Sequence, residues 1–359
     1  MRIGKISENV LIRSVLRKIK TKREEVLCGA GIGIDCAVLS FDGNDETVIS
    51  TNPVSAPTDM VCCYGIHRAL NNIAAAAAEP VGIMISAVLP EDTEEKELQD
   101  MMKQAETLAG RFNVQIIGGH TEVMPDIKTP VLTITGIGKR SKSNPSINKN
   151  DTSVINIGRD AATSKGIKTE QDTIISRKIK TGQDVIISKW IGLEGTVRLA
   201  REHKDELITR YPIGMIDDAA EFEQFLSVIP EAATAVKSGV CGMHDVSSGG
   251  IFAALWEMAD SAGVGLEVEL KKLPIRQETI EICEFYDLNP YELLSGGCLL
   301  MTAENGTDLV MELEKAGIPA VIVGKTTAGN DRVILNEEER RFLEPPKTDQ
   351  IYQMYYDRK

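Results

Sequence analysis

The sequence contains no CxxC pair and no apolar run long enough to cross a membrane, and these absences narrow the classes of protein that it can encode. Its seven cysteines are an odd number, and only Cys62 and Cys63 are adjacent. We therefore expect reduced thiols in a cytoplasmic protein, without a disulfide framework or a structural zinc site. The most apolar stretch, IAAAAAEPVGIMISAVLP, is interrupted by Glu79 and Pro80, so it predicts the end of a helix followed by a strand.

Several motifs of nucleotide and hydrolase chemistry are missing as well. The chain has no GxGxxG turn followed by an acidic residue and no GxxxxGKS or GxxxxGKT sequence, so a dinucleotide fold or a P-loop is not supported. It has no GxSxG elbow, and the serines near His244 are too close along the chain to indicate a Ser-His-Asp triad. The basic N-terminal segment lacks the apolar core of a signal peptide and fits a short amphipathic helix.

Positive charge is scarce relative to negative charge. Lys and Arg total 40 against 53 Asp and Glu, which gives a formal net charge of −13. This acidity argues against nucleic acid or an anionic membrane as a partner, because both require a basic surface. A nucleotide site remains compatible with it, since a phosphate pocket needs only local donors. With 359 residues, 42% of them hydrophobic, the chain can form two domains with buried cores.

The chain alternates strand-like and helix-like segments, which predicts an α/β (α+β) fold. We expect strands at 47–52, 81–90, 114–119 and 131–138, and helices at 60–79 and 94–112. Residues 141–178 are polar and have no sustained apolar period, so they are interpreted as an insertion or linker. After them, helical segments including 194–208 alternate with further strands.

The first candidate site is the glycine-rich segment CGAGIGIDCAV, residues 28–38. Gly29, Gly31 and Gly33 allow backbone N–H groups to approach phosphates closely, and Asp35 can hold a magnesium ion. The alternative is a flexible turn that leads into a strand and carries a surface aspartate.

The second candidate site is the segment IIGGHTEV. Gly118 and Gly119 are expected to end a strand, so that His120, Thr121 and Glu122 lie at a strand end facing a cleft. In that position His120 can bond a phosphate or a reacting group, and Glu122 can orient it or reach a metal through water. Alternatively, the histidine is satisfied by backbone carbonyls where the strand meets a loop.

The third candidate site is MHDVSSGG, residues 243–250, which leads directly into a predicted helix. Ser247 or Ser248 can cap this helix, and its N–H groups, with Gly249 and Gly250, can form an anion-binding end. A capped helix that binds nothing is the alternative.

Taken together, these segments resemble the AIR synthase-related (PurM-like) ATP-binding superfamily. The resemblance covers nearly the whole chain apart from 141–178, and the second half is similar to the HypE-like members of hydrogenase maturation. The matching segments, in the order of the family, are GIDCAV, NNIAAAAAEP, IIGGHTEV, GLEGT, MHDVSSGGIFAALWEMADSAGVGLEV, LPIRQETIEICEFYDLNPYELLSGGCLLM and AVIVGK.

The resemblance implies a two-domain PurM-like fold, whose N-terminal mixed sheet pairs in a homodimer barrel. It also implies ATP and Mg²⁺ as cofactors and transfer of the γ-phosphate to an oxygen or selenium nucleophile. The expected boundaries are an N-terminal helix and glycine loop at 1–30, an N-terminal ATP-binding domain at 31–140, the insertion at 141–178, a C-terminal α/β domain at 179–345 and a tail at 346–359.

The resemblance also assigns roles to single residues. The glycine loop would cover phosphates and Asp35 would serve Mg–ATP. Thr51, Asn52 and Asn72 fall at positions where the family binds the metal and nucleotide. His120 lies in the Gly-Gly-His-Thr form of selenophosphate synthetases. The implied catalytic residues are His120, Glu122 and Asp245, and the implied cofactor-binding residues include Gly118, Gly119, Thr121, Gly249 and Gly250.

The sequence departs from the family pattern at the metal site. Asn52 and Asn72 replace two carboxylates, and Ile34 stands where many relatives have a further aspartate. Because hard cations depend on carboxylate charge, magnesium binding should be weakened. HypE proper carries its modified group on a C-terminal cysteine, whereas this chain ends in QMYYDRK, so we do not expect that carrier reaction on its own tail.

Two hypotheses follow. The first is an ATP-dependent enzyme that activates a small amide, carboxylate or thio substrate, within hydrogenase or metallocofactor maturation. The second is a catalytically silent member that binds nucleotide or associates with a maturation-protein partner.

Overall fold

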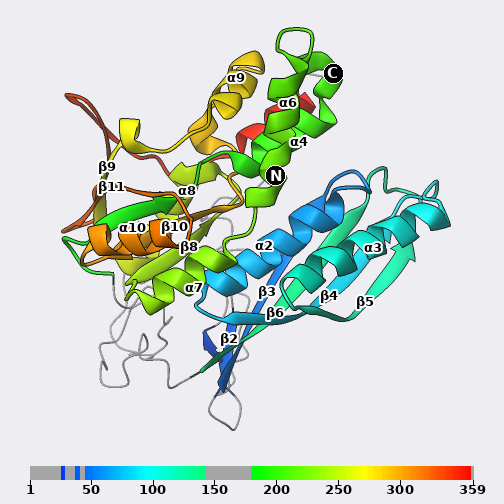
Figure 1. Cartoon of the computed structure of the whole chain (residues 1–359), viewed down its shortest axis with the longest axis horizontal. Helices are drawn as coiled ribbons and strands as arrows, with labels where there is room; N and C mark the ends of the chain where they lie inside the picture. The colour runs from blue at the N-terminus through cyan, green and yellow to red at the C-terminus, as the bar shows by residue number, and fades with distance from the viewer. Residues whose placement is uncertain (1–25, 29–36, 41–44, 142–178, 357–359) are drawn as a thin grey trace, which may run out of the picture. The chain divides into compact units, whose positions relative to one another are not determined.

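The computed structural model describes residues 26–28, 37–40, 45–141 and 179–356 (Figure 1). These residues form two compact units, which we call the N-terminal unit (up to 141) and the C-terminal unit (179–356). Each unit contains one sheet with helices, so the predicted α/β class is confirmed. The predicted N-terminal helix and most of the predicted insertion lie outside the described residues.

The sheet of the N-terminal unit has the strand order β1-β2-β3-β6-β4-β5. Its strands are β1 (Val26–Cys28), β2 (Ala37–Ser40), β3 (Asp45–Ser55), β4 (Glu79–Leu89), β5 (Gln115–Val123) and β6 (Val131–Ser141). Only β4 and β5 pair in parallel, and α3 (Glu95–Arg111) connects them, as a parallel pair requires. Glu94 and Glu97 form a capping box at the start of α3, with the Glu94 N–H donating to Glu97 at 2.7 Å.

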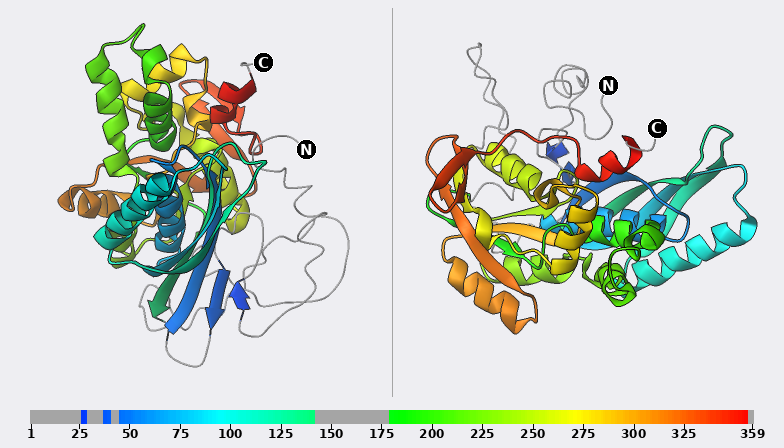
Figure 2. Two further views of the ribbon diagram at one scale, coloured as in Figure 1. Left: turned by 90° about the vertical axis from the view of Figure 1, so that its right-hand side faces the viewer. Right: turned by 90° about the horizontal axis from the view of Figure 1, so that it is seen from above.

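Helix α2 (Val61–Ala75) lies against the same face of this sheet as α3 (Figures 1 and 2). It approaches the strands closely because glycine occupies the contact positions. A Cβ on Gly65 would lie 2.8 Å from the Ile134 side chain, and one on Gly138 would lie 2.4 Å from the Ile73 side chain. All residues of α2 except Arg68 are buried.

The other face of this sheet carries no helix among the described residues of the N-terminal unit. Alternate residues of β6 are buried and half-buried, as expected when only one face is covered. The uncovered face and the adjoining edge include large apolar side chains that are 43–54% exposed: Val81, Met84, Ile117 and Val123.

The sheet of the C-terminal unit has the order β13-β12-β9-β11-β7-β10-β8. Its strands are β7 (Asp184–Ser188), β8 (Gly242–Val246), β9 (Gly265–Glu269), β10 (Cys298–Ala303), β11 (Ala320–Thr327), β12 (Arg332–Asn336) and β13 (Glu339–Phe342). Its α-helices are α4 (Leu193–Glu202), α5 (Lys204–Leu207), α6 (Ile213–Ala220), α7 (Ile229–Lys237), α8 (Gly250–Ala262), α9 (Gln277–Phe285), α10 (Gly306–Lys315) and α11 (Gln353–Tyr356). The helix predicted at 194–208 is in fact split into α4 and α5 at His203.

Helix α8 forms the core of the C-terminal unit with the sheet. Its Ile251, Leu255 and Met258 pack in one cluster with residues of β7, β9 and β10. Burial of each such side chain contributes about 1.5–3 kcal/mol. Gly263, with a φ of 65°, ends the helix in the left-handed conformation that glycine favours. A second cluster joins α4, α6 and α9, and it also contains Ile351 from near the end of the chain.

Two neighbouring cations on β6 offer a matched stability test in the N-terminal unit. Arg140 is 2% exposed, donates to Glu46 at 2.7 Å and to the Ala76 carbonyl at 2.9 Å, whereas the Lys139–Glu79 pair is exposed. We expect Arg140→Met to destabilise this unit by about 3–5 kcal/mol, because it leaves a buried carboxylate without its cation. Lys139→Met should cost less than about 1 kcal/mol.

Hydrogen exchange of β3 and β6 peptides in urea measures this difference. Tryptophan fluorescence is the internal control, because Trp190 and Trp256 both lie in the C-terminal unit and should report an unchanged transition. Equal destabilisation by the two variants would contradict the assignment of the buried pair.

Candidate functional site

The segment that carries His120 is an edge strand, not a strand end. β5 continues through the two glycines to Val123, with Ser86 opposite His120 and Val88 opposite Glu122 in the parallel register. The prediction that Gly118 and Gly119 end the strand is therefore wrong. Hydrogen bonding to β4 keeps this segment extended, which outweighs the low strand propensity of glycine.

His120 and Glu122 lie on the same side of β5 because they are two residues apart. Their side chains are 71% and 53% exposed, and His120 Nε2 lies 3.6 Å from Glu122 Oε2. The structure therefore brings these two predicted residues together. An exposed ion pair of this kind contributes little to the free energy of unfolding. Stability therefore does not explain why these two residues are paired.

The backbone of β4 explains why position 119 is a glycine. Its φ is +154°, and a Cβ on it would lie 1.9 Å from the Ile85 carbonyl oxygen. Gly118 is different, because the nearest atom to a Cβ there is the Met84 methyl group at 3.9 Å. Only the second of the two glycines is required by the local fold.

Two of the predicted metal-site residues meet at one hydroxyl group. The Asn52 and Asn72 side-chain amides donate to Ser50 Oγ at 3.2 and 3.0 Å. Thr51 points to the opposite face of β3, where its hydroxyl lies 2.9 Å from that of Thr135. Alternation along the strand separates the Thr51 side chain from the two asparagines, although the family resemblance assigns all three to the cofactor site.

The described residues do not form a metal site. Among them there is no group of three or more His, Cys, Asp or Glu side chains that could hold a metal ion. The amide groups of Asn52 and Asn72 are neutral, so they do not offset the charge of Mg²⁺. Gly29, Gly31, Gly33 and Asp35 lie outside the described residues.

In the C-terminal unit, β8 holds a buried histidine and a buried aspartate. Asp245 is 3% exposed, and its carbonyl oxygen lies 2.7 Å from His244 Nδ1. His244 Nε2 lies 3.7 Å from Glu257 on α8. This end of the sheet therefore concentrates ionisable groups in the interior, which is typical of functional sites.

Three glycine-containing turns meet at this end of the sheet. We call them the glycine junction: residues 192–196 after β7, 247–250 after β8 and 293–297 before β10. Ser295, which is fully buried, connects all three. Its hydroxyl accepts from the Gly192 N–H at 2.7 Å and donates to the Leu293 carbonyl, and its own N–H donates to the Ser247 carbonyl at 3.2 Å.

The prediction that a serine caps α8 is wrong. The N-cap is Gly249, with a φ of 85°, and no side chain caps the helix from that position. Instead, the Gly249 N–H donates to Asp349 Oδ2 at 2.6 Å, so the anion at this helix end comes from the chain itself. The glycines set a turn that carries the serines away from the capping position.

A buried ion pair at the end of β7 was not found from the sequence. Lys189 has a φ of 52°, and its Nζ lies 2.6 Å from Glu231 and within 2.7 Å of the Phe225 and Ser227 carbonyls. In sequence, Lys189 is one of many charged residues and nothing marks its partner 42 positions away (231 − 189 = 42). Only the fold brings them together.

The cysteines that the structure describes with their surroundings are all free and buried: Cys62, Cys63, Cys241, Cys283 and Cys298. Burial raises the pKa of Cys62 and of Cys283 to about 12, and it raises that of Cys298 as well. These thiols are protonated at neutral pH and are poor nucleophiles.

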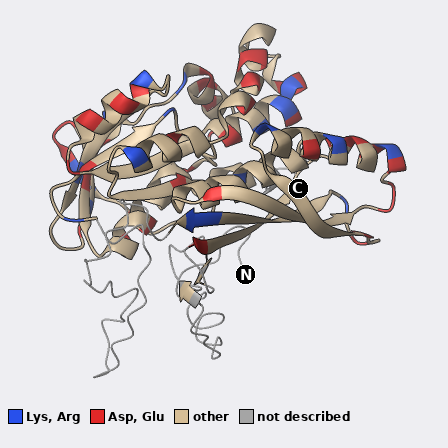
Figure 3. Ribbon diagram, turned by 60° about the horizontal axis from the view of Figure 1, so that its bottom comes forward, with Lys and Arg blue, Asp and Glu red and all other residues tan. Residues whose placement is uncertain are grey.

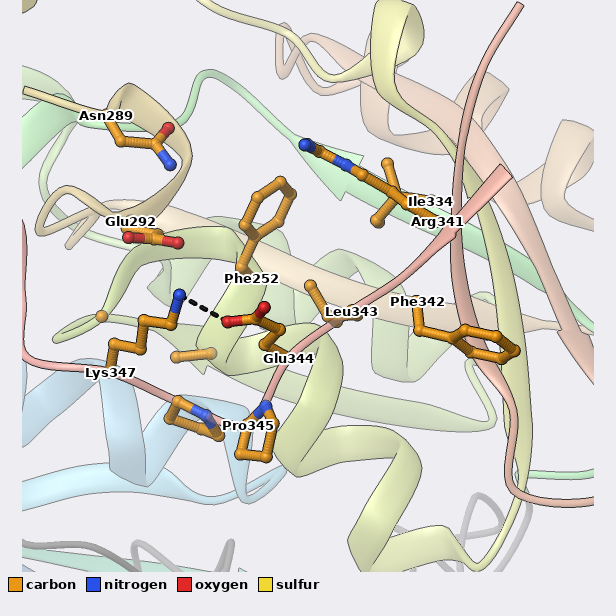
Figure 4. A pocket seen from close by; sticks show the side chains of 13 residues that line it. Phe252, Asn289, Glu292, Ile334, Arg341, Phe342, Leu343, Glu344, Pro345 and Lys347 are labelled. Atoms are coloured by element: carbon orange, nitrogen blue, oxygen red, sulfur yellow. Dashed lines mark ion pairs between the residues drawn. The ribbon is translucent and has the colours of Figure 1, made fainter. Parts of the chain in front are cut away.

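A cavity of about 180 Å³ lies beside the glycine junction (Figure 4). Its wall includes Gly249 and Phe252 of α8, and Phe252 stacks on Tyr291 with ring centroids 5.2 Å apart. The segment that follows β13 forms another part of the wall, where Lys347 pairs with Glu344 at 2.5 Å. The cavity mixes aromatic and charged groups.

These features define a two-domain α/β protein with a glycine pair in β5 of the N-terminal unit and the glycine junction in the C-terminal unit. Family models confirm this class: the AIR synthase related protein N-terminal domain matches residues 33–139, and the C-terminal domain of the same family matches 180–336. The chain belongs to the AIR synthase related family. Its helices within the described residues include none that is long and apolar enough to span a membrane.

The relatives extend over most of the chain. A putative hydrogenase expression/formation protein of Methanocaldococcus jannaschii is 22% identical, over 97% of this chain and 96% of its own length. Carbamoyl dehydratase HypE of Rhodobacter capsulatus is 24% identical, over 77% of this chain and 72% of its own.

Solved structures share the fold. HypE from E. coli has a TM-score of 0.67 at 17% identity and covers 85% of this chain and 87% of its own. HypE in complex with ATP has a TM-score of 0.65 at 17% identity and covers 97% of each chain. Thiamine monophosphate kinase from Aquifex aeolicus has a TM-score of 0.63 at 16% identity, covering 95% of this chain and 99% of its own.

The two glycines of β5 can be tested as a pair. We expect Gly119→Ala to destabilise the N-terminal unit by about 3 kcal/mol or more, because the new Cβ meets the backbone of β4 in a conformation that alanine rarely adopts. Gly118→Ala should change stability by less than about 1 kcal/mol, since the space beside it is open. Hydrogen exchange of β5 peptides measures the effect, and a tolerated Gly119→Ala would show that the glycine is not required by the fold.

Proposed function

We propose that this protein is a HypE-like ATP-binding protein that activates a small amide, carboxylate or thio substrate by phosphoryl transfer, in the maturation of a hydrogenase or a related metallocofactor. The observation that carries the proposal is the collinear match to a putative hydrogenase expression/formation protein across 97% of this chain. A match to one domain alone would support only a shared fold.

The names of the relatives indicate the chemistry. The HypE relatives are named carbamoyl dehydratases, and one HypE structure contains ATP. Transfer of the γ-phosphate to an amide oxygen forms an O–P bond and releases ADP. The oxygen then leaves as phosphate when the C–O bond breaks, while the electron pair of the remaining N–H bond forms a further C–N bond and the proton is released. Such a reaction depends mainly on positioning and on neutralising charge.

In this proposal the roles that the family resemblance implies are assigned to residues of each unit separately. Gly29, Gly31, Gly33 and Asp35 hold the nucleotide with Gly118 and Thr121. His120, oriented by Glu122 at 3.6 Å, moves a proton at the substrate. Within the C-terminal unit, Asp245 and Gly250 keep the catalytic and cofactor-binding roles that the family resemblance implies. We derive no step through a protein-bound magnesium ion, because the described residues do not supply the carboxylates that it requires.

A second candidate function is a catalytically silent member that works by association. The specific observation in its favour is that Asn52 and Asn72 engage Ser50 and carry no charge. The HypE–HypF complex is a solved example of a HypE bound to another maturation protein, and it supports a protein partner for this chain as well. We place the activity in the cytoplasm, with no role for nucleic acid.

Calorimetric titration with ATP, followed by phosphate release from the same sample, separates the two functions. We expect ATP to bind in the presence of magnesium and to be hydrolysed slowly until the substrate is supplied. The absence of ATP binding both with and without magnesium would overturn the proposal and leave association as the function.

The double variant Asn52→Asp, Asn72→Asp extends this titration. Two nearby carboxylates should raise the affinity for Mg²⁺ by about tenfold or more. In a catalytically silent protein the affinity for Mg²⁺ rises and there is no phosphate release to lose. An enzyme adapted to the asparagines should instead lose phosphate release. Asn113→Asp, at an exposed turn, is the control for added charge.

We also propose that the protein is a homodimer formed through the uncovered face of the N-terminal sheet. Val81, Met84 and Ile117 expose apolar surface there, and few charged residues lie along these strands (Figure 3). Contiguous exposed apolar surface of this kind marks an interaction site.

A charge placed on this face should prevent association. We expect Met84→Glu to give the mass of one chain by light scattering, where the unchanged protein gives the mass of two, because the carboxylate would be desolvated at the interface. The control is Met311→Glu on α10, where the methionine is 48% exposed compared with 43% for Met84. If the unchanged protein is already a monomer, or if Met84→Glu remains a dimer, this interface is wrong.

A further inference from the structure

Asp349, whose carboxylate accepts from the Gly249 N–H at the N-terminal end of α8, has no role in the proposed function. It lies in the segment between β13 and α11 and is 3% exposed. Its two oxygens accept from three backbone N–H groups: Oδ2 from Gly249 at 2.6 Å, and Oδ1 from Leu294 at 3.2 Å and Ile351 at 2.9 Å.

These bonds connect parts of the chain that are far apart in sequence. Gly249 belongs to the turn after β8, and Leu294 belongs to the turn before β10. The next residue, Gln350, strengthens the connection, because its side chain accepts from the Asn289 N–H at 3.2 Å and donates to Glu292 at 3.1 Å. Two consecutive residues of the C-terminal segment therefore hold the region that leads into the glycine junction.

The two turns cannot be held by close packing of side chains alone. A Cβ on Gly250 would lie 2.5 Å from the Tyr291 carbonyl and 2.8 Å from that of Leu293, so backbone lies against backbone here. Polar backbone groups in such a place require partners. A carboxylate is well suited to this role, because hydrogen bonds to a charged acceptor are stronger than neutral ones and the N-terminus of α8 attracts negative charge.

We propose that Asp349 is a positioning residue that fills the anion position of α8 from within the chain and fixes the turns flanking Asp245 and Cys298. Asp245 and Cys298 lie at the adjoining ends of β8 and β10, which are paired strands. Occupation of the Gly249 N–H by Asp349 means that a nucleotide phosphate binds elsewhere. This inference goes beyond the proposed function and concerns how its C-terminal site is built.

The proposal predicts that removing the carboxylate creates an anion site. We expect Asp349→Ala to lower the thermal midpoint of the full-length protein by about 5–10 °C, since three charge-assisted bonds are lost. Formate or inorganic phosphate should restore at least half of this loss, whereas chloride at the same ionic strength should not. Hydrogen exchange of a peptide covering 245–252 should speed up in the variant and slow down again with formate.

Two variants are controls for this experiment. Glu344→Gln removes a carboxylate from the same segment, but one whose ion pair with Lys347 is exposed, so its midpoint and its response to formate should match those of the unchanged protein. Asp349→Asn keeps an oxygen acceptor and fills the same volume. It should lose less stability and show no recovery with formate, and it remains informative if Asp349→Ala does not fold.

The outcome that overturns the proposal is equally specific. If Asp349→Ala keeps its midpoint, or if chloride restores it as well as formate does, Asp349 is not an internal anion for α8. The effect on phosphate release provides a separate measurement: a positioning role lowers the maximal rate and leaves the apparent affinity for ATP unchanged. Failure of ATP to bind the unchanged protein would remove the proposed function, but the stability and exchange results would still decide the role of Asp349.

Discussion

Within each unit, some neighbouring backbone segments lie so close together that only glycine fits between them. The rest of the structure depends on these glycine positions. In the N-terminal unit, Gly138 lies against the backbone carbonyl of Glu79 and leaves room for the Ile73 side chain of α2, and Gly119 lets β5 pair with β4. In the C-terminal unit, Gly324 stands where a Cβ would be 2.0 Å from the Glu267 carbonyl. Close-packed backbone cannot adjust by a change of rotamer. These contacts therefore fix the positions of the sheets and turns independently of the polar side chains.

The polar contacts of the glycine junction are therefore made at fixed positions of the backbone. In the glycine junction, backbone N–H and carbonyl groups face one another with few side chains between them. Ser295 and Asp349 satisfy these groups, and both are buried. Buried polar groups of this kind favour one arrangement of the chain over its alternatives when all of them are bonded. The ionisable residue Asp245 is thereby held in a region with little freedom to rearrange.

Much of the fold could be predicted from the sequence. Strands such as 131–138 and the helix at 94–112 have clear periodicity, and both are present with slightly different ends. The extension of β5 past Gly119 could not be predicted, because pairing with β4 supplies hydrogen bonds that a local pattern does not contain. The break between α4 and α5 at His203, where φ is −127° and ψ is 26°, was likewise not predicted.

The candidate site could be predicted only in part. The pairing of His120 with Glu122 follows from their spacing on a strand. The serine cap of α8 was a reasonable prediction for SSGG, but the left-handed turn at Gly249 gave the position to Asp349, which is 100 residues away in sequence. Convergence of Asn52 and Asn72 on Ser50 also depends on long-range packing, since a helix and a strand must meet to form it.

The buried thiols have a bearing on the chemical surroundings in which the protein can work. Soft metal ions such as nickel, copper and ferrous iron bind cysteine as the thiolate, and peroxides oxidise the same form. Burial keeps Cys62, Cys283 and Cys298 protonated by raising their pKa values. Cys62, Cys283 and Cys298 therefore present little thiolate to soft metal ions or peroxides, although the protein contains seven cysteines.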